Sequence, residues 1–160
     1  MSQAALQQKR DTDLQRFNDK DTDIMVFNLN DKVVLITGST GGLGKATAKA
    51  LLEKGAKLAL LDLDPAAIQA QVEELGGEAY AFGCAANVCS LKDLEQCFAA
   101  VCQHFGRIDV VIANAGVGYT EPLETMTEQS FEKMIDINLS GVFRTFKAAL
   151  PYVTQTRGHL

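Results

Sequence analysis

The segment Thr37-Gly38-Ser39-Thr40-Gly41-Gly42-Leu43-Gly44 decides the fold. It follows a short, continuous apolar run at residues 32–37, which is typical of a strand buried on both faces. A helical pattern starts at Leu43 and ends at Lys54-Gly55, a cation followed by a capping glycine. A glycine-rich turn between a strand and a helix tolerates unusual backbone angles and leaves no side chain in the way. We therefore predict a turn that presents the amides of a helix N-terminus to phosphate groups.

Each glycine of this loop has an expected task. Gly38 permits the tight turn, Gly42 lets the backbone approach a pyrophosphate, and Gly44 lets the helix pack close to the sheet. The competing phosphate motif, the P-loop, requires four residues between its glycines and then Lys and Ser/Thr. Here Lys45 is followed by Ala46, so the P-loop pattern fails. A purely structural glycine turn remains the alternative.

Strand and helix patterns alternate along the rest of the chain. Apolar runs predict strands at residues 57–61, 78–82 and 109–113, and periodic patterns predict helices at about 65–75, 91–105 and 128–153. This alternation predicts an α/β fold, a Rossmann-type doubly wound parallel sheet that is truncated after the fourth strand and its following long helix. Residues 25–160 form one dinucleotide-binding domain, incomplete at its C-terminus, and residues 1–24 a polar flexible extension. Met25 as the true start is a further hypothesis.

Composition narrows the function classes. With 160 residues and 47% hydrophobic content, the chain suits one compact domain, and its net charge of −5 argues against nucleic-acid binding and against an anionic membrane surface. No apolar run approaches the length of a membrane span. The four cysteines are Cys84, Cys89, Cys97 and Cys102, and the two histidines are His104 and His159. Without a C-x2-C pair or a secretory signal, we expect no metal site and no disulfide, but reduced core thiols in a cytoplasmic protein.

A carboxylate at the end of the second strand predicts the cofactor. Asp62 lies 18 residues after Gly44, where a dinucleotide fold faces the adenosine ribose. A carboxylate there accepts hydrogen bonds from the ribose hydroxyls and repels a 2′-phosphate, and Leu63 stands where an arginine could have bound that phosphate. This favours NAD over NADP. The alternative is that Asp62 caps the next helix, but Asp64, adjacent to Pro65, fits that role better.

Three motifs in the right order give the chain a family resemblance. The glycine pattern, Asn114-Ala115-Gly116 after the fourth strand, and Asn138 within residues 137–141 together resemble the short-chain dehydrogenase/reductase family. The resemblance covers roughly residues 27–160, the N-terminal part of that fold. It implies an NAD(P)-dependent oxidoreductase that moves hydride between the nicotinamide and a secondary alcohol or carbonyl. It also implies a small-molecule substrate and a homo-oligomer, dimer or tetramer, formed partly through the long helix.

The resemblance implies a set of cofactor-binding residues. They are Gly38, Thr40, Gly42, Leu43, Gly44, Asp62, Leu63, Asn87, Val88, Asn114, Ala115 and Gly116. Asn87 stands where the family commonly has aspartate; its amide oxygen can still accept from the adenine amino group, or it is only a strand-end turn residue. Asn114 either contacts the cofactor or only stabilises the sheet.

Asn138 is the one catalytic residue that we expect in the chain. Its spacing from Phe131 and Val142 places it on the buried stripe of the long helix, where an amide needs partners. The resemblance implies the asparagine of a proton relay; the alternative is a buried amide satisfied by backbone or water.

The serine and the Tyr-x-x-x-Lys that would complete the relay do not occur in the 160 residues. The tyrosines Tyr80, Tyr119 and Tyr152 are followed four residues later by Cys84, Leu123 and Thr156. Gly158-His159-Leu160 resembles the entry to a fifth strand. We therefore expect the chain alone to be inactive and poorly soluble. The alternative is a non-catalytic dinucleotide-binding module or pseudoenzyme.

Overall fold

The computed structural model describes residues 28–160, which form a parallel sheet of four strands in the order β3-β2-β1-β4. The strands are β1 (Val33–Thr37), β2 (Lys57–Asp62), β3 (Ala81–Ala85) and β4 (Val110–Ile112). The helices are α2 (Gly42–Leu52), α3 (Pro65–Glu74), α4 (Leu91–Phe105), α5 (Glu128–Ile135), the π-helix η1 (Asp136–Ser140) and α6 (Gly141–Thr156). The predicted doubly wound sheet is confirmed, while the extension 1–24 and the Met25 start lie outside the described residues.

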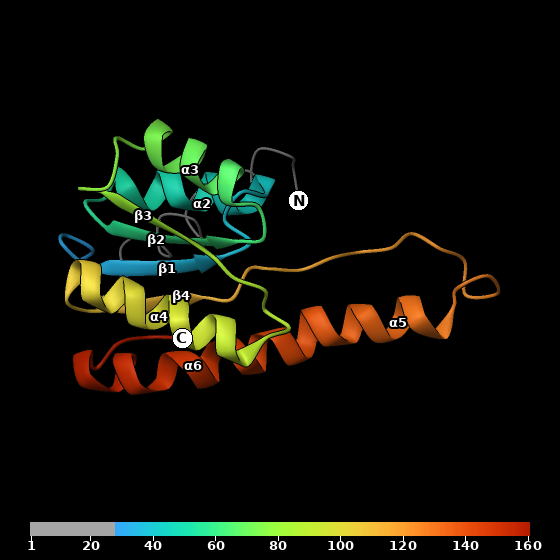
Figure 1. Ribbon diagram of the computed structural model, residues 1–160. Coiled ribbons are helices and arrows are strands. Elements are labelled where there is room, and N and C mark those ends of the chain that lie inside the picture. The colour runs from blue at the N-terminus through green and yellow to red at the C-terminus, as the bar shows by residue number, and fades with distance from the viewer. Residues whose placement is uncertain (1–27) are drawn as a thin grey trace, which may run out of the picture.

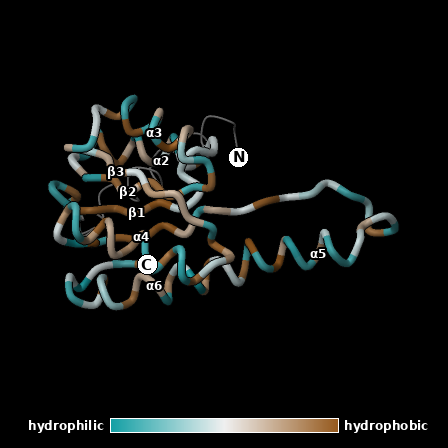
Figure 2. Tube along the Cα trace, in the orientation of Figure 1, coloured by the Kyte–Doolittle hydropathy of each residue, from teal (hydrophilic) through white to brown (hydrophobic). Residues whose placement is uncertain are grey.

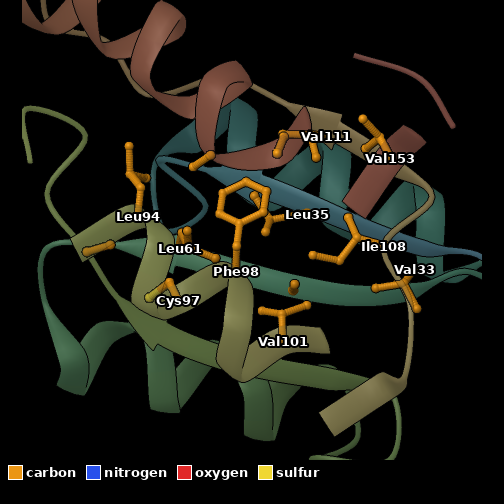
Figure 3. Close-up of a cluster of buried hydrophobic side chains, with 14 residues drawn as sticks. Val33, Leu35, Leu61, Leu94, Cys97, Phe98, Val101, Ile108, Val111 and Val153 are labelled. Atoms are coloured by element: carbon orange, nitrogen blue, oxygen red, sulfur yellow. The ribbon is translucent and has the colours of Figure 1, made fainter. Parts of the chain in front are cut away.

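Helices cover both faces of the sheet, α2 and α3 on one side and α4 and α6 on the other (Figure 1). Successive residues of β1 therefore enter different cores. Val34 and Ile36 pack under α2 and α3, whereas Val33 and Leu35 face α4 and α6. Figure 3 shows the second core around Phe98, whose side chain is fully buried. A strand buried on both faces explains the unbroken apolar run that marks β1 in the sequence.

The helix ends follow the expected local chemistry. The Asp64 side chain accepts from the amides of Ala66 and Ala67 at the start of α3, and Pro65 occupies the first helical position. Ser90 accepts from the amide of Asp93 at 3.2 Å and starts α4. Asp64, and not Asp62, is thus the cap of α3, as predicted.

The third strand lies three residues later than predicted, at Ala81–Ala85 in place of 78–82. Gly76 and Gly77 both have positive φ, and the Gly77 carbonyl accepts from the amides of Tyr80 and Ala81 at 3.0 Å. This turn uses residues 78–80, which the apolar alternation alone assigns to the strand. Tyr80 is consequently 53% exposed.

The long helix runs on without a break from α5 through η1 to α6, but the buried stripe predicted for it does not extend into α5. Phe131 and Ile135 are 53% and 41% exposed, whereas Ala149 is fully buried. Two causes act together: α5 extends beyond the sheet (Figures 1 and 2), and the π-turn adds a residue that shifts the helical phase. Within residues 28–160, neither this helix nor any other combines the length and apolar character needed to cross a membrane.

The cysteine prediction is also wrong in part. Cys84 of β3 and Cys97 of α4 form a disulfide, with their Cα atoms 5.8 Å apart, while Cys89 and Cys102 are free thiols. The two cysteines meet because α4 packs against β3, on the same face of the sheet as the Cys84 side chain. Sequence spacing alone does not show that contact.

The last residues of the chain lie against the outer edge of β4. His159 forms a parallel bridge with Val110, its amide donates to the Asp109 carbonyl at 2.9 Å, and its carbonyl accepts from the amide of Val111 at 3.0 Å. This is the place predicted for the entry to a fifth strand.

Candidate functional site

A cleft of about 540 Å³ opens at the carboxyl ends of the parallel strands. This is the edge at which open α/β sheets bind ligands, and the volume suits a small molecule. All twelve residues predicted to bind a cofactor line it: Gly38, Thr40, Gly42, Leu43, Gly44, Asp62, Leu63, Asn87, Val88, Asn114, Ala115 and Gly116. Among the described residues, no group of three or more His, Cys, Asp or Glu side chains is placed to hold a metal ion.

Sequence reasoning missed seven further lining residues: Thr37, Gly41, Leu61, Ala86, Leu94, Val117 and Ile137. Most of them adjoin a residue that the motifs single out, so widening each motif by one position finds them. Leu94 differs, because it enters the cleft from the buried face of α4.

The glycine loop packs against its neighbours too closely for side chains. Gly38 has φ +64°, and a Cβ there would lie 2.8 Å from the Cα of Ala115. A Cβ at Gly44 would lie 2.7 Å from the Cα of Ser39, so glycine at this position lets the first turn of α2 approach the loop that follows β1. Around Gly42 no atom lies within 4 Å of the Cβ position. The loop is tight at both ends and open in the middle.

The N-terminus of α2 has no side-chain cap, unlike the starts of α3, α4 and α5. Its N-cap is Gly41, and the first helical hydrogen bond runs from the Lys45 amide to the Gly41 carbonyl at 2.9 Å. The amides of residues 42–44 precede that bond, and all three residues line the cleft. An uncapped helix start concentrates free N–H groups and the positive end of the helix dipole, which favours an anion.

The Asp62 carboxylate is held at the end of β2, next to the glycine loop. Its Oδ2 accepts from the Thr40 amide at 2.9 Å and from the Thr40 hydroxyl at 2.7 Å, and its Oδ1 accepts from the Leu63 amide at 2.8 Å. Burial opposes its ionisation, but these hydrogen bonds outweigh burial and hold the pKa of Asp62 below its ordinary value. The group therefore presents a fixed negative charge at the end of β2. The spacing of the glycine motif does not indicate that Asp62 pairs with Thr40.

Asn114 fastens the end of β4 to the glycine loop. Its side-chain amide donates to the carbonyls of Thr37 and Gly38 at 2.9 and 3.0 Å. The Thr37 hydroxyl accepts from the backbone amides of Asn114 and Ala115 at 3.1 and 3.0 Å. The structural role considered for Asn114 is thus present, and the residue also lines the cleft.

Asn87 is a turn residue at the end of β3, as one of its two interpretations supposed. Its Oδ1 accepts from the Cys89 amide at 2.9 Å, and its carbonyl accepts from the Ser90 amide at 2.8 Å. The following Val88 packs against Gly141, where a Cβ would lie 3.1 Å from its methyl group. This turn therefore connects the wall of the cleft with the start of α6.

Asn138 is exposed, not buried as predicted, because it lies in η1, where the helical phase changes. Its amide group nevertheless has two partners: it donates to the Val117 carbonyl at 2.7 Å and accepts from the Val117 amide at 2.8 Å. This reciprocal pair fastens η1 to the loop after β4. Ile137 lines the cleft, and Asn138 itself does not.

Comparison with known proteins gives consistent matches. The family model described as short chain dehydrogenase matches residues 32–160. An uncharacterised oxidoreductase of Listeria monocytogenes is 34% identical over 136 residues, 84% of this chain and 55% of its own length. D-threitol dehydrogenase of Mycolicibacterium smegmatis is 38% identical over 118 residues, 73% of this chain and 45% of its own.

The solved structures agree with these sequence matches. The crystal structure of 3-ketoacyl-(acyl-carrier-protein) reductase from Brucella melitensis complexed with NADH superposes with a TM-score of 0.73 at 30% identity, covering 78% of this chain and 50% of that one. The chain spans about half the length of the curated relatives that it matches.

Proposed function

Because the chain belongs to the short-chain dehydrogenase family, we propose that residues 25–160 are the dinucleotide-binding portion of an NAD-dependent oxidoreductase. The whole protein would transfer hydride between the nicotinamide and a secondary alcohol or carbonyl. One observation carries the proposal: a single cleft joins the uncapped N-terminus of α2 to a fixed carboxylate at the end of β2. Anion binding and ribose recognition need these two features side by side.

The glycine loop would hold the pyrophosphate. The amides of Gly42, Leu43 and Gly44 would donate to its oxygens, and the open space around Gly42 lets a phosphate approach the backbone. Gly38 and Gly44 would act through the loop shape, since a side chain at either position collides with backbone. The residues present therefore fit the cofactor.

The adenosine half would lie over the ends of β2 and β3. Asp62 would accept from the ribose hydroxyls and repel a 2′-phosphate, which favours NAD over NADP. Leu63, 68% exposed, and Val88 would provide apolar contacts to the adenine. The side-chain amide hydrogens of Asn87 have no partner among the described residues, so this side chain can still offer a donor beside its occupied oxygen.

The remaining motifs would complete the site. Asn114, Ala115 and Gly116 would pack beside the adenosine half of the cofactor and stabilise the sheet, and Asn138 would belong to the proton relay. Bound nicotinamide supplies or receives the hydride. The family resemblance implies a general acid, a tyrosine four residues before a lysine, and no such pair occurs in the 160 residues. The chain by itself should therefore bind the dinucleotide without turning over a carbonyl.

The whole protein's properties stay predictions of the same proposal: a small-molecule substrate, a homo-oligomer and a cytoplasmic location. The Cys84–Cys97 disulfide bears on the last, because disulfides persist mainly in oxidising compartments. Alkylation of the protein's thiols in intact cells, followed by mass spectrometry, measures whether the pair is oxidised where the protein resides.

Calorimetric titration of the 160-residue chain with NADH and NADPH tests the proposal. Wild type should prefer NADH, and Asp62→Ala should weaken NADH by about tenfold, the scale of one charged hydrogen bond, and NADPH less. Asp64→Ala is the matched control, because it removes a carboxylate two residues away that caps α3 outside the cleft. Equal loss for both nucleotides in Asp62→Ala would undo the specificity argument, and no binding by folded wild type would refute the function.

A further inference from the structure

The π-turn η1 interrupts the long helix directly before α6. Its backbone hydrogen bond runs from the Gly141 amide to the Asp136 carbonyl, five residues apart, where an α-helix would span four. Such turns are rare and occur mostly singly inside α-helices, frequently at functional sites. This one carries Asn138, whose side chain is paired with the Val117 backbone. A contact that exists only with the π-turn would therefore help to fix where Asn138 points.

Arg144 of α6 binds the first residue of the turn twice. Its Nη2 donates to the Asp136 carboxylate at 2.7 Å, and its Nη1 donates to the Asp136 carbonyl at 3.3 Å. The hydrogen bond from Arg144, followed by one from the Cys89 thiol, holds the pKa of Asp136 below its ordinary value, so the carboxylate is charged at neutral pH. The side chains of Arg144 and Asp136 are 25% and 45% exposed, so water screens part of their attraction.

The spacing of these two residues makes their contact specific to the π-turn. Each residue of a regular α-helix turns by about 100°, so residues eight apart, as Asp136 and Arg144 are, would point about 80° apart. The π-turn takes up one extra residue, and the two side chains then stand as residues seven apart would, within about 20° of each other. An interaction made in only one of two conformations shifts the equilibrium towards that conformation.

We propose that Arg144 and Asp136 are positioning residues for Asn138. Their ion pair holds the π-turn, and the π-turn keeps the Asn138 amide on the backbone of Val117. The inference rests on the proposed function, since Asn138 has its part in the proton relay only there. Neither Arg144 nor Asp136 lines the cleft, so both act through the helix and not on the nucleotide.

Hydrogen–deuterium exchange of the 160-residue chain, read at single residues by fragmentation in the mass spectrometer, tests this inference. The Val117 amide is the reporter, because it donates to the Asn138 side chain. Arg144→Met removes the guanidinium but keeps an apolar stem, and Arg144→Lys keeps the charge. Lys147→Met is the matched control, because it removes a cation from the same helix at an exposed position over the Phe143 ring.

Three further measurements make the readout decisive. Asn138→Ala removes the partner of the reporter amide and sets the upper limit of its exchange rate. The amides of β2, in the middle of the sheet, report opening of the whole fold. Asp136→Ala removes the same ion pair from its other side and replaces Arg144→Met if that variant does not fold.

Exchange of the Val117 amide should rise about fivefold in Arg144→Met, the upper scale of a part-exposed ion pair, while β2 keeps its rate. The rate should fall back in Arg144→Lys, stay unchanged in Lys147→Met and be highest in Asn138→Ala. This pattern separates a local effect on Asn138 from a general loss of stability, which would raise exchange in β2 as well.

An unchanged Val117 rate in Arg144→Met, or an equal rise in β2, overturns the inference. A rate in Arg144→Lys as high as in Arg144→Met overturns it too, because the ion pair would then contribute nothing. An unchanged rate in Asn138→Ala would show that the reporter contact is absent, with the same consequence. Calorimetry of wild type with NADH tests the function separately: a folded chain that binds no NADH refutes the function, while the exchange rates still decide whether Arg144 positions Asn138.

Discussion

A carboxylate introduced at position 42 separates the stability of α2 from its capacity to receive an anion. Gly42 is the first residue of α2; its φ is not positive, and no atom lies within 4 Å of its Cβ position. An aspartate there meets no steric obstacle. Its charge also interacts favourably with the helix dipole, by about 0.3–1 kcal/mol. Gly42→Asp should therefore fold and melt at or above the wild-type temperature.

The same charge should exclude a pyrophosphate. Two like unit charges about 4 Å apart repel by about 4 kcal/mol at an effective dielectric constant of about 20. The cleft is open to solvent, so we discount this by half to about 2 kcal/mol. Since about 1.4 kcal/mol corresponds to tenfold, NADH affinity should fall by about thirtyfold. Gly42→Asn is the matched control, because it has the same shape without the charge.

Circular-dichroism melts and calorimetric titration with NADH measure the two effects separately. The aspartate variant should melt at or above the asparagine variant and bind NADH far more weakly. Equal NADH affinity of the two variants would show that the phosphates do not approach α2. A lower melting temperature for the aspartate variant would instead refute the account of the uncapped helix end.

Four other outcomes follow from the structure. Burial opposes ionisation of Asp109, but the Arg107 hydrogen bonds, the Val33 amide and the nearby cations outweigh burial and lower the pKa of Asp109. The ionised side chain should therefore stabilise the fold above the ordinary pKa of 3.8, and this stabilisation should be lost as pH falls towards the lower pKa of the folded state. Asp109→Asn should lower the free energy of unfolding by about 2–4 kcal/mol at neutral pH and flatten its acid dependence in urea titrations. Reducing the Cys84–Cys97 disulfide should lower the free energy of unfolding by roughly 3 kcal/mol, and alkylation of the unreduced, denatured chain should modify two thiols, with four contradicting the disulfide. Phe143 is 64% exposed on the long helix, so the isolated chain should self-associate, and a monomeric sedimentation profile would count against this. The purified chain should oxidise no NADH with small carbonyls, and any turnover above background would refute the inference that the 160 residues lack the general acid.

The glycine loop predicted most of the site because it combines a strand, a turn and a helix in one local segment. Once parallel strands are assigned, their carboxyl ends meet at one edge, which is why Asp62, Asn87 and Asn114 reach the same cleft without adjacency in sequence. Asp64 shows the same strength of local chemistry, because its capping role depends only on its neighbours.

What the sequence did not predict depends on contacts between elements or on changes of helical period. The Thr40–Asp62 pair and the Cys84–Cys97 disulfide each join residues from different elements, which no spacing rule connects. The burial of Asn138 was predicted from a constant period of 3.6 residues, and η1 breaks that period.

The π-turn also governs the direction in which the outer half of the long helix faces. A deletion of one residue within Asp136–Ser140 would restore a regular α-helix and rotate α5 by about 100° relative to α6. Asn138 would then lose its alignment with Val117, and Phe131 would face a different side of the molecule. An insertion or deletion here would therefore change the outer surface while the core beneath α6 stayed intact, so the two halves of one helix can diverge separately in evolution.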